Sequence, residues 1–448
     1  MIRSVTSISS LLLGMGILLS GSGLLGILLG LRANDEQFGE LVIGFVMAGF
    51  YLGYVIGAMV CPRVIEHFGH IRAFTAFAAA SAALTLGYGL MVHPAVWLIL
   101  RILNGIALLG LYMVIESWIN HRAGQDRAQV FSIYMMVNLV AIAIGQYLIL
   151  IKGVDGVETF AIAATLFSLG LLPIALTPVT QPEPIRTERL GIGRLFAVSP
   201  VGVAGALFSG LIYGSFWSFA AIYGRLLGMS DGQAASFVVA AVMGGAFLQW
   251  PIGWLSDRFD RRYVMLVVSL ASAAALTSFN WMPSTSLAVL LGVAVVFGGF
   301  IFSLYGLAVA QTHDRFSANE SLEATKGMLM VHGVGSAIGP VFTGAMISNL
   351  AGGFTMSLSL MALCLAAFTL IRIRLDKPVP VQDKTVFAPM DQASPVAMDL
   401  DPRSPDFVEP APEPTTEAEI GIAPGSPADA AAAAAAVNGW QPEVKPAS

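Results

Sequence analysis

Long apolar runs alternate with short polar breaks along most of the chain. A run of about 18 or more apolar residues is typical of a membrane-spanning helix, which needs about 20 residues to cross the hydrocarbon core. Twelve such runs occur, at residues 7–30, 38–60, 71–92, 95–119, 128–151, 157–177, 199–226, 233–256, 263–283, 286–312, 323–349 and 353–374. The pattern predicts an all-α membrane protein with twelve transmembrane helices.

The composition agrees with this pattern and excludes several other classes of protein. Only 11% of the residues are charged, against roughly 25% in soluble globular proteins. Two cysteines are too few for a disulfide framework, and the one close pair among the six histidines, His67 and His70, has no acidic or cysteine partner at zinc-like spacing. No G-x-x-x-x-G-K-[ST] motif occurs, so ATP hydrolysis by a P-loop is excluded. We therefore expect neither a metal nor a cofactor, and no enzyme.

The basic residues are distributed unevenly between the two sides of the predicted membrane. If the N-terminus lies in the cytoplasm, sixteen of the arginines and lysines up to residue 377 fall on the cytoplasmic side of the membrane. Three fall on the opposite side, namely Arg32, Lys152 and Arg225. Cytoplasmic segments are enriched in basic residues. Because an even number of spans places both termini on one side, the asymmetry predicts that both termini are cytoplasmic.

Two polar segments divide the chain. Residues 178–198 separate the sixth and seventh spans and predict a cytoplasmic central linker between an N-terminal half, 1–177, and a C-terminal half, 199–374. Residues 375–448 hold thirteen of the 23 prolines, with twelve acidic and four basic residues, and so a formal charge of −8. Such a composition is typical of disorder. We expect a disordered cytoplasmic tail that does not dock on the rest of the protein.

The two halves repeat each other weakly. At an offset of 194 residues, "RILNGIA" in the fourth span aligns with "VVFGGFI" in the tenth, which pairs Gly105 with Gly299. The same offset pairs Gly145 of the fifth span with Gly339 of the eleventh. Repetition of six spans by six in parallel is typical of transporter folds.

Several motifs resemble those of the major facilitator superfamily, over roughly residues 5–374. "GWLSDRFDRR", at 253–262, resembles the loop motif G-x-L-x-D-R-x-G-R-R, with Asp260 in place of a glycine. "RILNG" resembles the fourth-helix motif R-x-x-Q-G, with Asn104 in the glutamine position. "ESWIN", "LQWPIGWLSDR" and "THDR" resemble the YcaD-like bacterial branch. The resemblance implies two pseudo-symmetric six-helix halves and secondary transport, and it specifies no substrate.

The loop motif is a candidate cytoplasmic gate. The resemblance implies that Asp257 faces a neighbouring helix, and we predict that in the outward-open state it faces the N-terminus of the helix at 323–349, where free N–H groups favour an anion. The three arginines of the motif are expected to pair with nearby acids. The alternative is that the cluster only sets orientation. The complete predicted gate is Gly253, Asp257, Arg258, Arg261, Arg262, Glu66, Arg72 and Arg127.

The fourth span carries the most informative intramembrane charge. At ~100° per residue, Arg101, Tyr112 and Glu116 fall on one side of the helix, with Asn104 at the edge. Ionisable residues in a span usually face the protein interior, so these four are candidates for the substrate or proton pathway. The alternative for Arg101 is that it snorkels to the outer interface. Glu116 is expected to serve in a cytoplasmic gate or a structural ion pair, with Arg122, Arg127 or a charge of the first-half loop as its partner, more than to carry a proton.

Three further residues complete the predicted pathway. His332 lies near the middle of the eleventh span and titrates near neutral pH, so it is a candidate proton carrier; a structural, hydrogen-bonded histidine is an equal alternative. Tyr213 and Trp217 of the seventh span are candidates to line a cavity, or to form an aromatic belt at the membrane interface.

We therefore predict a monomeric secondary transporter that moves a small solute across the bacterial inner membrane by alternating access, without nucleic-acid partners. Proton coupling is a hypothesis. "GVGSAIGP" at 333–340 resembles an antiporter motif but lies in the eleventh span instead of the fifth, so efflux and uptake by symport both stay open. The rival from another class is a non-transporting receptor or scaffold that recruits a partner through its acidic tail.

Overall fold

The computed structural model describes residues 2–123, 127–176, 191–282, 286–380 and 384–387, and regular structure within these ranges is helical. The short 3-10 helices are Leu148–Ile151 and Phe279–Trp281. The α-helices are α1 (Ile2–Asp35), α2 (Glu40–Phe68), α3 (His70–Leu90), α4 (Pro94–Ala123), α5 (Arg127–Tyr147), α6 (Glu158–Ala175), α7 (Ile192–Val198), α8 (Pro200–Leu226), α9 (Asp231–Arg258), α10 (Arg261–Ser278), α11 (Leu287–His313), α12 (Ala318–Asn349) and α13 (Gly353–Leu375). In these ranges, twelve helices are long and apolar enough to cross a membrane. The predicted all-α fold with twelve spans is confirmed.

Helix boundaries differ from the hydropathy pattern where polar residues continue a helix beyond the apolar run. α9 ends at Arg258, two residues later than expected, so Asp257 belongs to its last turn. α12 begins at Ala318, five residues earlier than expected. The short helix α7 lies within the segment expected to be a linker. Hydropathy locates the part of a helix that lies in the membrane, and not the part that extends into water.

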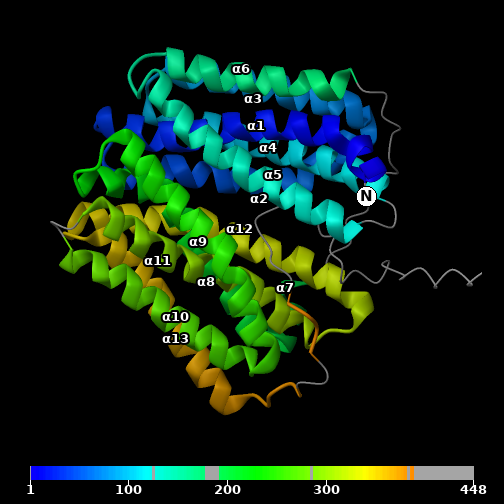
Figure 1. The fold of residues 1–448 in the computed structure, drawn as a ribbon, viewed down its shortest axis with the longest axis vertical. Coiled ribbons are helices and arrows are strands. Elements are labelled where there is room, and N and C mark those ends of the chain that lie inside the picture. The colour runs from blue at the N-terminus through cyan, green and yellow to red at the C-terminus, as the bar shows by residue number, and fades with distance from the viewer. Residues whose placement is uncertain (1, 124–126, 177–190, 283–285, 381–383, 388–448) are drawn as a thin grey trace, which may run out of the picture. The chain divides into compact units, whose positions relative to one another are not determined.

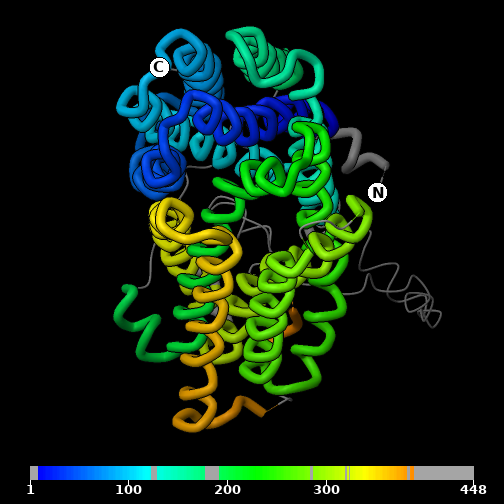
Figure 2. The backbone as a smooth tube through the Cα atoms, turned by 90° about the vertical axis from the view of Figure 1, so that its left-hand side faces the viewer, coloured from blue at the N-terminus to red at the C-terminus, as the bar shows by residue number. Residues whose placement is uncertain are grey.

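The internal repeat appears as equivalent glycine contacts in the two groups of helices, α1–α6 and α8–α13 (Figure 1). A Cβ added at Gly145 of α5 would overlap the carbonyl oxygen of Ser20 in α1. At the equivalent Gly339 of α12, a Cβ would overlap the carbonyl oxygen of Leu211 in α8. In each group the fifth spanning helix therefore approaches the first through a glycine at the same place. Figure 2 shows the helices of the second group, green to orange, running side by side.

Contacts between the two halves occur at the end of the bundle where α1 ends and α2 begins. Arg225, in the last turn of α8, forms an ion pair of 2.7 Å with Asp35 at the end of α1. The hydroxyl of Tyr147 in α5 lies 3.1 Å from the hydroxyl of Ser236 in α9. α2 also packs closely on α12, where a Cβ at Gly44 would lie 2.5 Å from the carbonyl oxygen of Pro340. These contacts join the halves at this end.

The described part of the C-terminal tail contacts the helices. The ring of Phe387 packs so closely on α9 that a Cβ added at Gly253 would overlap it. Thr385 donates hydrogen bonds from its N–H and its hydroxyl to the carboxylate of Asp314, at 2.9 and 3.0 Å. The expectation that the tail does not dock is therefore wrong for Lys384–Phe387. Residues 381–383 and 388–448 lie outside the described part of the chain, so the expected disorder there stays a prediction.

Candidate functional site

A central cavity is lined by residues of both halves. α1, α2, α4 and α5 contribute from the first half, and α8 and α9 from the second. Its empty space is about 1100 Å³, including the part open to solvent. Five of the seven predicted pathway residues line it: Arg101, Asn104, Tyr112, Tyr213 and Trp217.

Arg101 lies in the cavity wall with its charge poorly compensated. Its side chain is buried, and its guanidinium carbon lies 4.7 Å from the centre of the Phe50 ring. One terminal nitrogen lies 3.7 Å from the sulfur of Met47, while Nε has no hydrogen-bond partner. Among the described residues no carboxylate pairs with Arg101. Because an arginine within a span costs several kcal/mol, about 2.5–3.5 by insertion scales, such a site is most economically explained by a ligand.

The position of Arg101 follows from glycines that bring α2 and α4 together. A Cβ at Gly105 would overlap the carbonyl oxygen of Phe50, and one at Gly53 would overlap that of Ile102. At Gly49 an added Cβ would lie 3.3 Å from the Cβ of Arg101 itself. The two helices are therefore too close to admit side chains at these positions. This close contact places Arg101 against α2, with its side chain buried. Its burial disfavours the snorkelling alternative.

Other polar atoms of the cavity wall are buried and unpartnered. Asn104 Nδ2, Gln146 Oε1 and Trp217 Nε1 have no hydrogen-bond partner among the described residues. Tyr112 donates a long hydrogen bond of 3.4 Å to Asn138 of α5. Buried polar groups without partners are uncommon in folded proteins, because each loses its hydration without replacement. Together with Arg101 Nε they belong to residues that line one cavity, where a polar ligand would satisfy them.

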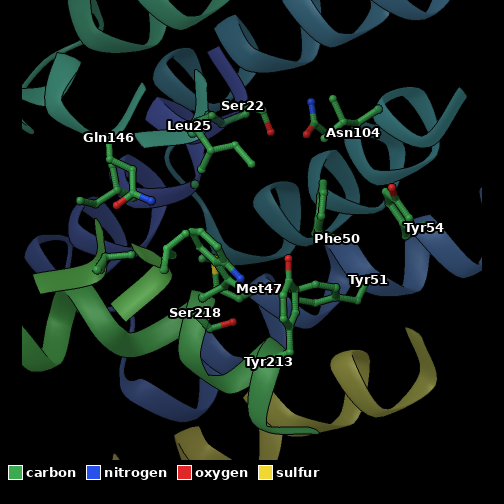
Figure 3. A pocket seen from close by; sticks show the side chains of 18 of the residues that line it. Ser22, Leu25, Met47, Phe50, Tyr51, Tyr54, Asn104, Gln146, Tyr213 and Ser218 are labelled. Atoms are coloured by element: carbon green, nitrogen blue, oxygen red, sulfur yellow. The ribbon is translucent and has the colours of Figure 1, made fainter. Parts of the chain in front are cut away.

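Aromatic side chains from both halves meet in the cavity. The ring centres of Tyr51 in α2 and Tyr213 in α8 are 6.4 Å apart, and those of Tyr213 and Trp217 are 6.0 Å apart. Phe50 and Tyr51 are 5.4 Å apart, edge to face. Figure 3 shows Tyr51 and Tyr213 side by side, with Gln146 and Tyr54 on opposite sides of the cavity. The aromatic wall of the cavity therefore spans the boundary between the halves.

Sequence reasoning missed the α2 and α5 residues of the cavity. Met47, Tyr51 and Tyr54 follow the spacing i, i+4, i+7 of one helical face, a signal that was available in the sequence. Asn138 and Gln146 are isolated polar residues in an apolar span. Such residues usually face the protein interior, so they too were detectable.

Two predicted pathway residues do not line the cavity. Glu116 is fully buried and accepts a hydrogen bond from the hydroxyl of Tyr134 in α5, a neutral partner that the sequence did not suggest. His332 is buried, and its Nδ1 lies 3.1 Å from the hydroxyl of Ser209. Its ring packs 5.4 Å from that of Tyr213, which does line the cavity. His332 therefore lies behind the cavity wall, whereas Glu116 faces α5 through Tyr134, which does not line the cavity.

The loop motif at the end of α9 forms a network with α11. Arg261 is buried and pairs with Asp257 at 3.0 Å and with Asp314 at 2.7 Å. Arg262 pairs with Asp260 at 2.6 Å, and the Arg262 N–H donates to the same carboxylate, which caps the start of α10. Burial alone would raise the pKa of Asp260, but the hydrogen bonds from Arg262 outweigh it and hold the pKa below its usual value. Since that pairing is lost only as the pH falls through the lowered pKa, it persists between about pH 5 and 8.

Two members of this motif have partners that the sequence did not indicate. Asp257 accepts a hydrogen bond of 3.1 Å from the N–H of Phe387 in the tail, and its predicted contact with the N-terminus of the eleventh span in the outward-open state stays a prediction. Arg258 was expected to pair with an acid, but its guanidinium carbon lies 3.7 Å from the centre of the Trp254 ring. Asp257 thus binds the backbone of the chain's own tail, and the ring of Phe387 packs on Gly253 of the motif.

Two of the predicted gate residues of the first half, Glu66 and Arg72, do not join this network in the structure. Glu66 and Arg72 are exposed and form no ion pair with any described residue. Arg127 is the first residue of α5, and its side chain lies outside the described part of the protein. Their role in a gate stays a prediction.

A family model described as the Major Facilitator Superfamily matches residues 11–322 and 202–417. The chain belongs to the major facilitator superfamily. Transporters named YcaD and described as uncharacterized, from Escherichia fergusonii and Escherichia coli O45:K1, are each 26% identical to it over 76% of this chain and 88% of theirs. These relatives place it in the YcaD branch, as the motifs predicted.

Solved structures of transporters share the superfamily fold. The nucleoside transporter NupG has a TM-score of 0.68 at 13% identity, covering 82% of this chain and 99% of that one. A D-xylose-proton symporter has a TM-score of 0.65 at 17% identity, covering 86% and 99%. At these identities the likeness shows the fold alone. The superfamily assignment makes the chain a multi-pass membrane protein and a secondary transporter, and not an enzyme.

Proposed function

We propose that the chain moves a small solute across the bacterial inner membrane by alternating access, acting as a monomer, and that the central cavity holds the solute. This proposal rests on the observation that both halves line the cavity. Arg101 and Tyr51 come from the first half, and Tyr213 and Trp217 from the second. A solute in this cavity touches both halves at once. Movement of one half against the other then changes the side from which the solute is reached.

The contacts between the halves support a particular state. Asp35 and Arg225, and Tyr147 and Ser236, join the ends of helices that the basic-residue asymmetry assigns to the periplasmic side. With both termini cytoplasmic, the described state is closed to the periplasm. A reporter that is active only in the periplasm, fused after Asp376, should be silent; activity there would reverse this assignment.

Proton coupling, as part of this proposal, runs through residues that do not line the cavity. Among the described lining residues there is no carboxylate and no histidine. His332 packs against Tyr213, which lines the cavity, and Glu116 lies one helical turn after Tyr112, another lining residue, so these two groups are the candidates to exchange a proton. The direction of transport, uptake or efflux, is measured by whether solute moves with or against the protons when a pH gradient is imposed on the proteoliposomes.

Crosslinking at the closed end tests alternating access. The native cysteines are first removed by Cys61→Ser and Cys364→Ser. Tyr147→Cys and Ser236→Cys are then introduced, and the two new thiols are joined by a bifunctional reagent in proteoliposomes. We expect solute counterflow, screened over metabolites and drugs, to stop after crosslinking and to return when a cleavable crosslink is reduced. Each single-cysteine variant, treated in the same way, is the control.

Two results would contradict the proposal. Undiminished counterflow after complete crosslinking would mean that the halves do not separate at this end. Saturable solute binding without counterflow of any solute would favour the receptor or scaffold function.

A further inference from the structure

We infer that the solute is a small organic anion with a flat apolar ring, of which an aromatic monocarboxylate is the simplest form, and that its acidic group binds Arg101. This inference rests on the proposed function of the cavity as the transport site. It concerns the chemical class of the solute, which neither the fold nor the relatives specify.

The cavity wall carries a positive charge. Arg101 is the one charged residue among the described lining residues, and it forms no ion pair with a described residue. Its Nε lacks a hydrogen-bond partner. A buried guanidinium is stable when a carboxylate or phosphate satisfies its planar set of donors. None of the described lining residues provides such a group, so an anionic solute completes the site.

The polar atoms of the cavity wall that lack a hydrogen-bond partner also favour an anionic solute. Two of them, Asn104 Nδ2 and Trp217 Nε1, are donors, and one, Gln146 Oε1, is an acceptor. Together with the arginine, the wall offers a surplus of donors. A solute rich in acceptors matches it, with one donor, such as a hydroxyl, for Gln146. A cationic solute would meet Arg101 without any carboxylate to offset the repulsion.

The aromatic wall specifies the rest of the molecule. Phe50 and Tyr51 from α2 and Tyr213 and Trp217 from α8 present ring faces and edges within one cavity. Aromatic pairs are favourable at ring-centre separations of about 4.5–7 Å, offset or edge to face. A flat ring in the cavity, packed against these groups, contacts both halves while its acidic group binds Arg101. Acids without a ring lack this contact.

Binding of matched pairs of compounds tests the inference without requiring transport. Isothermal titration of the purified full-length protein in detergent compares benzoate, 4-hydroxybenzoate and indole-3-acetate with the corresponding amides, with acetate and with 4-hydroxybenzylamine. We expect at least one ring acid to bind ten times more tightly than its amide, a difference of about 1.4 kcal/mol, and acetate and the amine to bind more weakly still. An amide equal to its acid in every pair, or tighter binding of the amine, would overturn the inference.

Substitution of the arginine separates its role from a general preference for acids. Arg101→Gln should reduce the preference for acid over amide to less than threefold, whereas Arg101→Lys should retain it at lower affinity. Arg63→Gln, which removes an exposed arginine outside the cavity, is the control and should bind as the wild type does. An undiminished preference in Arg101→Gln, in protein with an unchanged elution profile, would place the anion elsewhere.

Counterflow of the same compounds distinguishes this inference from the proposed function. Ring acids that bind through Arg101 but show no counterflow would contradict transport and leave the binding site intact. Counterflow of the amine or the amides, with no counterflow of the acids, would contradict the inference and leave transport intact.

Discussion

At the scale of single residues, two features of α4 hold the cavity wall in place. Gly105 allows the backbone of α2 to approach one turn below Arg101, because a Cβ there would overlap the carbonyl oxygen of Phe50. Glu116, further along α4, is buried against α5 through the hydroxyl of Tyr134. The first feature depends on the absence of a side chain and the second on a hydrogen-bond acceptor, so they respond to different substitutions.

Gly105→Ala should destabilise the protein and impair transport together. The added methyl group meets backbone, which cannot move as a side chain can, and overpacking of this kind costs about 1–3 kcal/mol. Gly292→Ala in α11 is the matched control, since a Cβ there meets nothing within 4 Å. Thermal unfolding in detergent should show a lower midpoint for the first variant and an unchanged or higher one for the second. Equal midpoints would mean that α2 and α4 are not packed as described.

Glu116→Gln should preserve both stability and counterflow, because the amide oxygen still accepts the hydrogen bond from Tyr134. Glu116→Ala should be less stable by about 1–3 kcal/mol, because it leaves a buried hydroxyl without this acceptor. The thermal midpoints of the two variants measure this difference. If Glu116→Gln retains counterflow but loses transport driven by a pH gradient, the residue carries protons and its role is not only structural.

At the scale of elements, the tail segment Lys384–Phe387 is a strap across the ends of α9 and α11. Asp257 accepts a hydrogen bond from the N–H of Phe387, and Asp314 accepts one from the N–H of Thr385. Arg261 donates a hydrogen bond to the carbonyl oxygen of Thr385. Burial and the nearby Arg261 lower the pKa of Lys384. The strap binds the side chains of Arg261 and Asp314, which are 0% and 1% exposed, and a hydrogen bond to a charged group is worth about 1.5–3 kcal/mol, so loss of the strap should lower the stability measurably.

Truncation tests the strap against the expectation that the tail is dispensable. A chain ending at Phe387 keeps these contacts and should match the full-length protein. A chain ending at Pro380 loses them, and we expect a lower thermal midpoint and increased labelling of a cysteine placed at Ser256, in the background without native cysteines. If the two truncated chains behave alike, the docked segment contributes nothing and the original expectation holds.

The elements also show what the sequence was able to predict. The twelve spans followed from apolar runs, because the membrane imposes a length that hydropathy detects. α7 was missed because seven residues carry too little periodicity. The contact of Phe387 with Asp257 joins residues 130 positions apart, in a segment whose composition is typical of disorder, so no local pattern predicted it. Arg101 was found because a lone charge in a span has few explanations, whereas Tyr51 was missed because aromatic residues are common on lipid-facing surfaces.

At the scale of the whole transport unit, the repeat and the cavity belong to one mechanism. Gly145 and Gly339 pack the fifth spanning helix on the first in each half, so each half is built in the same way around its own close contacts. The cavity lies where these two similar bodies meet, and its wall takes Tyr51 from one and Tyr213 from the other. The central claim of this account is that the solute passes through that cavity.

Gly26 provides the most direct test of this claim, because it lines the cavity and a Cβ there meets nothing within 4 Å. In the background with Cys61→Ser and Cys364→Ser, the variant Gly26→Cys should transport solute until a bulky, charged thiol reagent modifies it. Counterflow should then stop, and excess solute should slow the modification. Arg63→Cys, exposed near the end of α2 and outside the cavity, should be modified without effect. Unchanged counterflow after complete modification of Gly26→Cys would contradict passage of the solute through the cavity.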